Sequence, residues 1–294
     1  MSTRPRPESD EKTRPKPVTL PGLLALKRER QPVAMITAYD FPTALAVDEA
    51  GVDIVLVGDS GAMTVLGYDS TVPVTVDEML TLTKAARRGV RRALLVGDLP
   101  FGSYEASDEL AVATATRFVK EAGCDAVKLE GGSGVPLARA KAIIAAGIPV
   151  MGHVGLTPQT ATALGGFKAQ GRTAEGARRI ADEARALQAA GCFCIVLEAI
   201  PAELTEQLMP SLDASLVIGI GAGPATDGQV LVLHDMVGLG SGGTAKFVKR
   251  YAELHGPLVD AVQRYAGEVR DRAYPGPEHS YAMPEAERER LDLG

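Results

Sequence analysis

The feature that most constrains the fold of this chain is one supersecondary pattern that recurs along most of its length. A short β-branched apolar run is followed by a loop that ends in a helix-capping residue, and then by an Ala-rich amphipathic segment closed by Gly. Near-continuous apolar runs are typical of parallel strands that are buried on both faces. The pattern predicts repeated βα units, with strands at 33–39, 53–59, 93–98, 126–130, 148–153, 193–198, 215–221 and 230–235.

Capping signals predict helices between these strands. The capping box Thr75-Val-Asp-Glu78 opens one such helix. Ser107 and Thr173 occupy equivalent positions before two others, which should end before Gly123 and Gly191.

Eight such units in a chain of 294 residues favour a single (β/α)8 barrel domain, and an open doubly wound sheet is the alternative. Aromatic residues make up only 4% of the chain, so the core must be built from Ala, Val, Ile and Leu. We expect the barrel at 19–274, a disordered Pro-rich charged tail at 1–18 and a C-terminal tail at 275–294. Two amphipathic segments, 20–30 and 244–266, exceed the eightfold core, and we expect them to cap it or to contact another subunit.

Composition and charge argue against several classes of protein. The formal net charge is −6 and no long block of Lys or Arg stands out, which argues against nucleic-acid binding. No apolar run reaches about 18 residues and the first residues lack the apolar region of a signal peptide, so no membrane span or secretory signal is predicted. The odd number of cysteines, Cys124, Cys192 and Cys194, suits a reducing compartment, and we expect all three to be buried. We therefore expect a cytoplasmic protein that acts on small molecules.

Ionisable residues stand where most of the predicted strands end: Asp40, Asp59, Asp98, Glu130, His153, Glu198 and the pair His234-Asp235. Active sites of (β/α)8 barrels lie at this end of the strands, so these groups should face one mouth. Any single Asp there could simply cap the next helix. Several carboxylates around one cavity would repel one another unless a cation lay among them, and this set of oxygen donors suits Mg²⁺ better than Zn²⁺.

Three residues near this mouth have both a functional and a structural interpretation. Lys128 stands two residues before Glu130, so both side chains face the same way, and it either binds an anionic substrate or forms a salt bridge in the core. His153 is either a substrate contact or a core histidine. Glu198 closes an apolar run, which suits a general base, but it could also be a structural carboxylate.

Two Gly-rich loops follow predicted strands. The sequence GIGAG at 219–223 is either a phosphate cradle or a tight turn with a close backbone approach. The sequence GGFKAQGR at 165–172 is long enough to form a lid over the mouth. Neither loop identifies a ligand by itself.

The longer motifs closely resemble the ketopantoate hydroxymethyltransferase family, which is also named after its substrate 3-methyl-2-oxobutanoate. The resemblance runs from about residue 20 to residue 281. The motifs that carry it are MITAYD (35–40), VGDSGAMTVLGYDSTVPVT (57–75), DLPFGSY (98–104), VKLEGG (127–132), GHVGLTPQ (152–159), GGFKAQGR (165–172), VLEAIP (196–201), GIGAGPATDGQ (219–229) and YPGPEHSY (274–281).

The resemblance implies a (β/α)8 TIM barrel of the phosphoenolpyruvate/pyruvate type, assembled as a homodecamer, with Mg²⁺ as its metal. It implies that 5,10-methylenetetrahydrofolate is the co-substrate and that the products are 2-dehydropantoate and tetrahydrofolate. Such an enzyme transfers a hydroxymethyl group to 3-methyl-2-oxobutanoate in pantothenate biosynthesis.

The match of motifs also implies roles for particular residues. The expected metal ligands are Asp59, Asp98 and Glu130, and the expected catalytic base is Glu198. The residues expected to bind the substrate are Asp59, Ser60, Asp98, Lys128 and His153. The chain departs from the family at Gly61-Ala62, where Leu-Gly is common, and this could alter the loop beside the ligand.

The chemistry of a 2-oxo acid agrees with these roles. Its keto and carboxylate oxygens can chelate Mg²⁺, which would stabilise the enolate formed when the C3 proton leaves. We expect Glu198 to take that proton, Lys128 and Ser60 to hold the substrate carboxylate, and the enolate to attack the methylene carbon of the folate.

Two other functions remain open from the sequence. One is a Mg²⁺-dependent C–C lyase of the same superfamily, although such lyases often use a Cys on a lid loop and GGFKAQGR has none. The other is a non-catalytic barrel that only binds a 2-oxo acid, which would need no general base.

Overall fold

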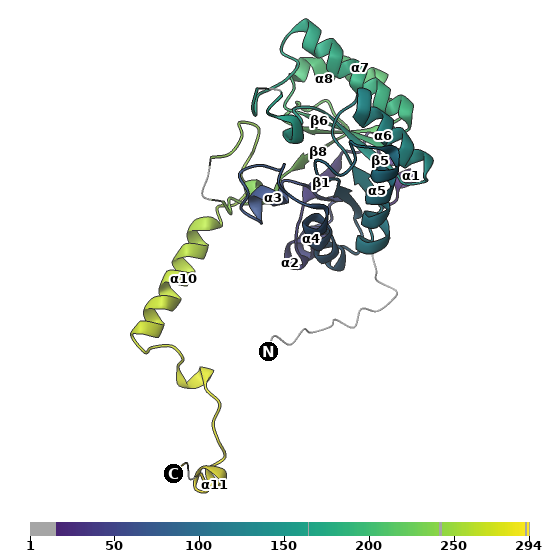
Figure 1. The fold of residues 1–294 in the computed structure, drawn as a ribbon. Helices are drawn as coiled ribbons and strands as arrows, with labels where there is room; N and C mark the ends of the chain where they lie inside the picture. The colour runs from purple at the N-terminus through teal and green to yellow at the C-terminus, as the bar shows by residue number, and fades with distance from the viewer. Residues whose placement is uncertain (1–15, 164, 241–242, 292, 294) are drawn as a thin grey trace.

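The chain forms a closed barrel of eight parallel strands, which Figure 1 shows for the computed structural model. The structure describes residues 16–163, 165–240, 243–291 and 293. The strands follow one another around the barrel in sequence order, and β1 closes it by pairing with β8. They are β1 (Val33–Thr37), β2 (Ile54–Val57), β3 (Leu94–Asp98), β4 (Ala126–Lys128), β5 (Val150–Gly155), β6 (Cys194–Glu198), β7 (Leu216–Ile220) and β8 (Gly228–Leu231). The predicted barrel is confirmed, and the open doubly wound alternative is wrong.

Most helices cover the outside of the barrel (Figure 1). They are α1 (Leu20–Arg28), α2 (Phe41–Glu49), α3 (Gly61–Thr64), α4 (Val76–Gly89), α5 (Asp108–Ala122), α6 (Gly134–Ala145), α7 (Ala174–Ala190), α8 (Ala202–Leu208), α9 (Leu233–Met236), α10 (His255–Arg270) and α11 (Glu285–Arg288). Single 3-10 turns lie at Pro158–Thr160, Met209–Ser211 and Pro277–His279.

The predicted helix caps are confirmed. Thr75 and Glu78 form the complete capping box of α4. The side chains of Ser107 and Thr173 accept hydrogen bonds from the first turns of α5 and α7. The left-handed residues Gly123 and Gly191 end these two helices.

The eighth strand lies earlier in the chain than the sequence predicts. It begins at Gly228 rather than Val230. A Cβ atom at residue 228 would lie 2.2 Å from the backbone oxygen of Val33, so glycine is what lets β8 approach β1 closely. The prediction that His234-Asp235 end a strand is therefore wrong, because both residues lie in α9.

Helix α1 closes the amino-terminal mouth of the barrel. Leu23 is completely buried and packs against the side chains that fill the barrel. The Nζ atom of Lys27 donates to the backbone oxygens of Leu212 and Ser215 at 2.7 and 2.8 Å, and to Asp227 Oδ2 at 2.7 Å. The expectation that this extra segment caps the core is confirmed, and the opposite mouth is left for the site.

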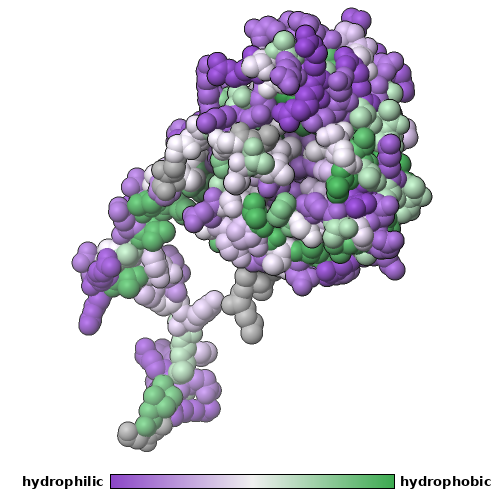
Figure 2. All heavy atoms as spheres, turned by 45° about the horizontal axis from the view of Figure 1, so that its top comes forward, coloured by the Kyte–Doolittle hydropathy of each residue, from purple (hydrophilic) through white to green (hydrophobic). Residues whose placement is uncertain are grey.

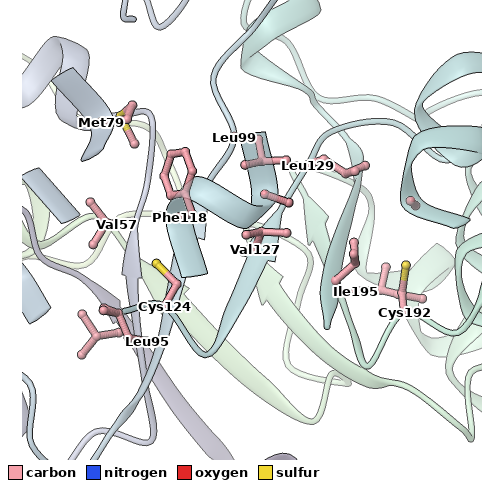
Figure 3. Packing of buried hydrophobic residues seen from close by; sticks show 14 of the residues in the cluster. Val57, Met79, Leu95, Leu99, Phe118, Cys124, Val127, Leu129, Cys192 and Ile195 are labelled. Atoms are coloured by element: carbon pink, nitrogen blue, oxygen red, sulfur yellow. The ribbon is translucent and has the colours of Figure 1, made fainter. Parts of the chain in front are cut away.

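Two layers of apolar side chains form the core. One layer fills the barrel, and the other lies between the strands and the helices, as Figure 3 shows around Phe118 and Val127. Gly97 of β3 makes room for Phe118, because a Cβ atom there would lie 2.5 Å from Cδ1 of the ring. All three cysteines are free and buried, as predicted.

The C-terminal segment leaves the barrel. Helix α10 begins later than the predicted segment 244–266, because Pro257 lacks a backbone N–H and fits only in the first turn of a helix. Figure 1 shows α10 and α11 extending away from the strands, and no residue of α10 is buried.

Of the predicted N-terminal tail, residues 1–15 lie outside the described part of the chain. No helix among the described residues is both long and apolar enough to cross a membrane.

Candidate active site

A cavity of about 170 Å³ opens at the carboxyl ends of the strands. One part of it, the charged half, is lined by Asp59, Ser60, Asp98, Lys128, Glu130, His153 and Glu198. The other part, the apolar half, is lined by Ile220, Val230, Leu231, Val232, Phe247 and Val248. The barrel therefore brings together all seven residues predicted for the site. Asp40 does not line the cavity, and its carboxylate caps α2 by accepting a hydrogen bond from the Thr43 amide at 2.9 Å.

Lys128 links two carboxylates of the charged half. Its Nζ atom donates to both oxygens of Asp98, at 2.9 and 2.8 Å, and lies 3.6 Å from Glu130 Oε1. The backbone amide of Asp59 donates to Asp98 Oδ2 at 3.1 Å. Lys128 and Glu130 line the same cavity, as their spacing on the strand predicts.

His153 lies between two carboxylates. Its Nδ1 atom is 3.2 Å from Glu130 Oε1, and its Nε2 atom is 3.1 Å from Glu198 Oε2. The second contact is at ion-pair distance but is not aligned as a hydrogen bond. The Glu198 side chain is 16% exposed, against 2% for Glu130, so Glu198 is the more accessible acid.

Burial and mutual repulsion shift the pKa values of this half of the cavity. Burial, together with the charges of Asp98 and Glu130, raises the pKa of Asp59 to about 8. Burial also raises the pKa of Asp98, although Lys128 opposes the rise. Burial and Lys128 disfavour a charged imidazole, but the neighbouring carboxylates still raise the pKa of His153 to about 9. The charged half contains more carboxylates than cations and therefore favours an added positive charge.

Gln159 joins several walls of the charged half, and the sequence analysis did not identify it. Its Nε2 atom donates to Asp59 Oδ2 and to the Leu99 backbone oxygen, both at 3.0 Å. Its backbone amide donates to Glu130 Oε2 at 3.0 Å, and its Oε1 atom accepts a 2.7 Å hydrogen bond from the Tyr104 hydroxyl. Gln159 and Tyr104 are the last residues of the motifs GHVGLTPQ and DLPFGSY. The presence of both residues in these motifs could have identified them as site residues.

The departure at Gly61-Ala62 fits the packing of this chain. The hydroxyl groups of Ser60 and Tyr39 are 2.8 Å apart. A Cβ atom at Gly61 would lie 2.7 Å from Cδ1 of Tyr39, so a larger side chain would displace the ring that contacts Ser60. Asp59 and Ser60 both line the cavity in spite of the departure.

The backbone just after Glu198 has an unusual conformation. Ala199 has a φ of 48°, a left-handed value that residues other than glycine rarely adopt. Its amide donates to the Ile220 oxygen at 2.8 Å, and its oxygen accepts from the Gln170 amide at 2.9 Å. These bonds tie Glu198 to β7 and to the loop at 165–172.

The glycines of GIGAG are explained by close packing. A Cβ atom at Gly221 would lie 2.5 Å from Cδ1 of Phe247, and one at Gly223 would lie 2.5 Å from Cβ of Ala202. Both glycines also have positive φ values, 63° and 80°. The interpretation as a turn with a close backbone approach is confirmed.

The fold and the cavity together define a (β/α)8-barrel protein with a polar site at the carboxyl ends of its strands. Solved structures with the same fold include oxaloacetate acetylhydrolase, with a TM-score of 0.59, 13% identity and 92% of each chain covered. Another is 2,3-dimethylmalate lyase, itself a member of the phosphoenolpyruvate mutase/isocitrate lyase superfamily, with a TM-score of 0.56, 16% identity, and 92% of this chain and 93% of that chain covered. At these identities the likeness shows the fold alone.

Sequence comparison assigns the family. The ketopantoate hydroxymethyltransferase family profile matches residues 17–277. The chain is 53% identical over 275 residues to the 3-methyl-2-oxobutanoate hydroxymethyltransferase of Oleidesulfovibrio alaskensis, which covers 94% of each chain. It is 55% identical over 260 residues to that of Saccharopolyspora erythraea, which covers 88% of this chain and 87% of the relative. The chain belongs to the ketopantoate hydroxymethyltransferase family.

Proposed function

We propose that the charged half binds 3-methyl-2-oxobutanoate and removes its C3 proton, with Glu198 as the base and 5,10-methylenetetrahydrofolate as the one-carbon donor. Family membership makes the chain a hydroxymethyltransferase of pantothenate biosynthesis. The assignment of the residues rests on one observation. Glu198, an accessible carboxylate, lines the same cavity as the buried cation Lys128 and the carboxylates around it.

The charged half fits a divalent cation that keeps several of its own water molecules. In the described part of the chain, no three His, Cys, Asp or Glu side chains are arranged as a metal cage. Mg²⁺ is usually held by only one or two carboxylates together with water and substrate oxygens, and Asp59 and Asp98 are two buried carboxylates on one cavity. We therefore assign Mg²⁺ to Asp59 and Asp98. Glu130, the third ligand predicted from the sequence, is instead held by Lys128, His153 and Gln159 beside them. The cation would supply Lewis-acid stabilisation to the oxygens of the oxo acid.

Lys128 and Ser60 are placed to bind the substrate carboxylate. Although burial disfavours an ammonium group, Asp98 and Glu130 raise the pKa of Lys128, so it remains a cation. The Ser60 hydroxyl can donate to the substrate while it accepts a hydrogen bond from the Tyr39 hydroxyl. The substrate carboxylate would then be fixed by one charge and one hydrogen bond.

Glu198 is the acid best placed to accept the C3 proton. Among the described residues, His153 is the polar side chain that contacts its carboxylate, whereas Glu130 is held by Lys128, His153 and Gln159. A base must reach its proton at hydrogen-bond distance, so an oxygen that is not already bound is an advantage. Loss of the proton leaves an electron pair that delocalises from C3 to the keto oxygen. As C3 bonds to the methylene carbon of the folate, one of that carbon's two C–N bonds breaks and the freed nitrogen takes up the proton removed from C3. Water then cleaves the second C–N bond, leaving its hydroxyl on the carbon and its proton on the other nitrogen, to give 2-dehydropantoate and tetrahydrofolate.

The two alternative functions find less support. The loop at 165–172 carries no Cys, and Cys124, Cys192 and Cys194 are buried in the core, so no thiol is placed for lyase chemistry in the described residues. A protein that only binds the oxo acid would have no need of an accessible carboxylate at Glu198.

Deuterium exchange tests the proposed function. The chain is incubated with 3-methyl-2-oxobutanoate and Mg²⁺ in D₂O, with and without 5,10-methylenetetrahydrofolate, and the C3 proton is followed by NMR. We expect exchange without folate, product only with folate, and loss of exchange in EDTA. An absence of exchange would indicate a binding protein, and carbon–carbon cleavage of 2-oxo-acid adducts without folate would indicate a lyase; either result would contradict the proposal.

A further inference from the structure

The two halves of the cavity differ in chemistry. The oxo acid is an anion, and the cations that suit it, Lys128 and His153, belong to the charged half. The apolar half is built by β7, β8 and the segment after α9. Asp235 is the one ionisable residue that lines the cavity outside the charged half in the described structure.

The carboxylate of Asp235 has no hydrogen-bond partner among the described residues. Asp235 lies in α9 and is only partly exposed. His234 and Arg250 influence its pKa only through their charge and form no hydrogen bond with it. A partly buried carboxylate without a donor is costly, so a ligand that brings N–H groups would be favoured there.

The oxo acid does not suit the position beside Asp235. A 2-oxo carboxylate would be repelled by Asp235, which follows β8, and would be attracted by Lys128 of β4, the strand four places from β8 around the barrel. The apolar half therefore remains for the second reactant. That half begins at Ile220 of β7, and β7 pairs directly with β6, which carries Glu198.

Phe247 gives the apolar half a fixed aromatic wall. Its ring lies against Gly221, where a Cβ atom would be 2.5 Å from Cδ1. Phe247 is partly buried and packs against the core layer inside the barrel. A flat heterocycle can pack well against such a ring and the neighbouring aliphatic side chains Leu231 and Val232.

We propose that Asp235 and the apolar half bind the pterin ring of the one-carbon donor, an inference that rests on the proposed function. The 2-amino-4-oxo edge of a reduced pterin is uncharged and presents two adjacent N–H donors. Two parallel N–H groups match the two oxygens of a carboxylate, in the way that a guanidinium group does. The ring faces would contact Phe247 and the aliphatic side chains, and the one-carbon group would face Glu198 and the C3 atom of the oxo acid.

The variant Asp235→Asn tests this inference, since it keeps the shape of the side chain but replaces one acceptor oxygen by a donor. We expect the KM for 5,10-methylenetetrahydrofolate to rise by about tenfold or more, the usual effect of losing a hydrogen bond to a charged group. C3 deuterium exchange of the oxo acid with Mg²⁺ needs no folate and should stay within about twofold of the wild-type rate. Asp213→Asn is the matched control, because Asp213 is exposed and lies before β7, at the opposite end of the barrel.

Two further measurements keep the outcomes separate. Phe247→Ala should also raise the KM for the folate without slowing exchange, and circular dichroism of each variant checks the fold. An unchanged folate KM in Asp235→Asn would overturn the inference, and so would an equal loss of exchange and of folate-dependent turnover. If wild-type chain shows no exchange at all, the proposed function fails instead, so the two failures are distinguishable.

Discussion

Gln159 alone donates hydrogen bonds to two carboxylates of the charged half. It contacts Asp59 through its side chain and Glu130 through its backbone amide, each at 3.0 Å. Loops after different strands are thus joined at the point where the substrate and the cation are expected. A buried amide with such partners positions the carboxylates rather than reacting itself.

Replacing Gln159 by Leu is expected to weaken Mg²⁺ binding more than it lowers the stability of the fold. The change removes the donor to Asp59 and the acceptor of the Tyr104 hydroxyl, each worth on the order of 1 kcal/mol. We expect the Mg²⁺ concentration for half-maximal activity to rise about tenfold, measured by Mg²⁺ titration of the transferase reaction. Tyr104→Phe leaves the bond to Asp59 in place and should have a smaller effect. An unchanged Mg²⁺ requirement in Gln159→Leu would contradict the positioning role.

Titration of the site should make stability depend on pH. Asp59 has a pKa raised from 3.8 to about 8, so its contribution to stability falls as pH rises from about 4 to 8. His153 has a pKa raised from 6.5 to about 9, so its contribution is present below pH 6.5 and is lost as pH rises through 9. In the absence of metal, both groups therefore make the folded protein less stable as the pH rises.

The variant Asp59→Asn is expected to flatten this dependence. Its side-chain oxygen can still accept the hydrogen bond from Gln159, but it cannot ionise. The Tm of the variant relative to wild type, measured by calorimetry in EDTA, should therefore increase between pH 5 and pH 8. Parallel curves for the two proteins would show that Asp59 does not titrate in this range.

At the scale of elements, the capping box of α4 gives a direct test of how the sequence determines where a helix begins. The Thr75 side chain accepts from the Glu78 amide at 3.2 Å, while Glu78 Oε2 accepts from the Thr75 amide at 2.8 Å. Thr75→Ala should lower the free energy of unfolding by about 1 kcal/mol in urea titrations. Ser133 is the matched control, since it precedes α6 without forming a cap hydrogen bond, and Ser133→Ala should cost less. Equal losses would contradict the capping argument.

Local sequence signals predicted elements well where one interaction dominates. Apolar runs located all eight strands because strands of a closed barrel are buried on both faces. The start of β8 was missed because Gly228 looks like a turn residue, although its use is a close approach to β1. The amphipathic segment predicted at 244–266 becomes helical only from His255, so that Pro257 lies in the first turn of α10.

The site was predictable for a related reason. Residues at strand ends converge because the barrel topology makes them converge, and this holds for Asp98, Lys128, His153 and Glu198. Gln159 and Tyr104 lie on loops, whose course depends on packing between distant segments. No periodic pattern reports such contacts.

At the scale of the whole molecule, α10 carries an apolar stripe that the barrel does not cover. Leu258, Val262, Tyr265 and Val269 follow helical spacing and are 44% to 57% exposed. Figure 2 shows apolar residues along this extended arm. An exposed stripe of this kind is typical of a surface that binds another protein chain.

We expect several copies of the chain to assemble through this stripe, in keeping with the homodecamer that the family resemblance implies. Sedimentation equilibrium should give a mass several times 30.8 kDa. Val262→Asp should reduce that mass because it places a charge in the apolar stripe. A wild-type protein that sediments as a 30.8 kDa monomer at micromolar concentration would contradict the expectation.

The central claim is that Glu198 removes the C3 proton of the oxo acid in this cavity. The most direct measurement is the rate of C3 deuterium exchange by Glu198→Gln, with Mg²⁺ and without folate, beside Glu203→Gln as an exposed control on α8. The account predicts that Glu198→Gln slows exchange by at least about 10²-fold, and that the control does not. Exchange by Glu198→Gln at the wild-type rate would contradict it.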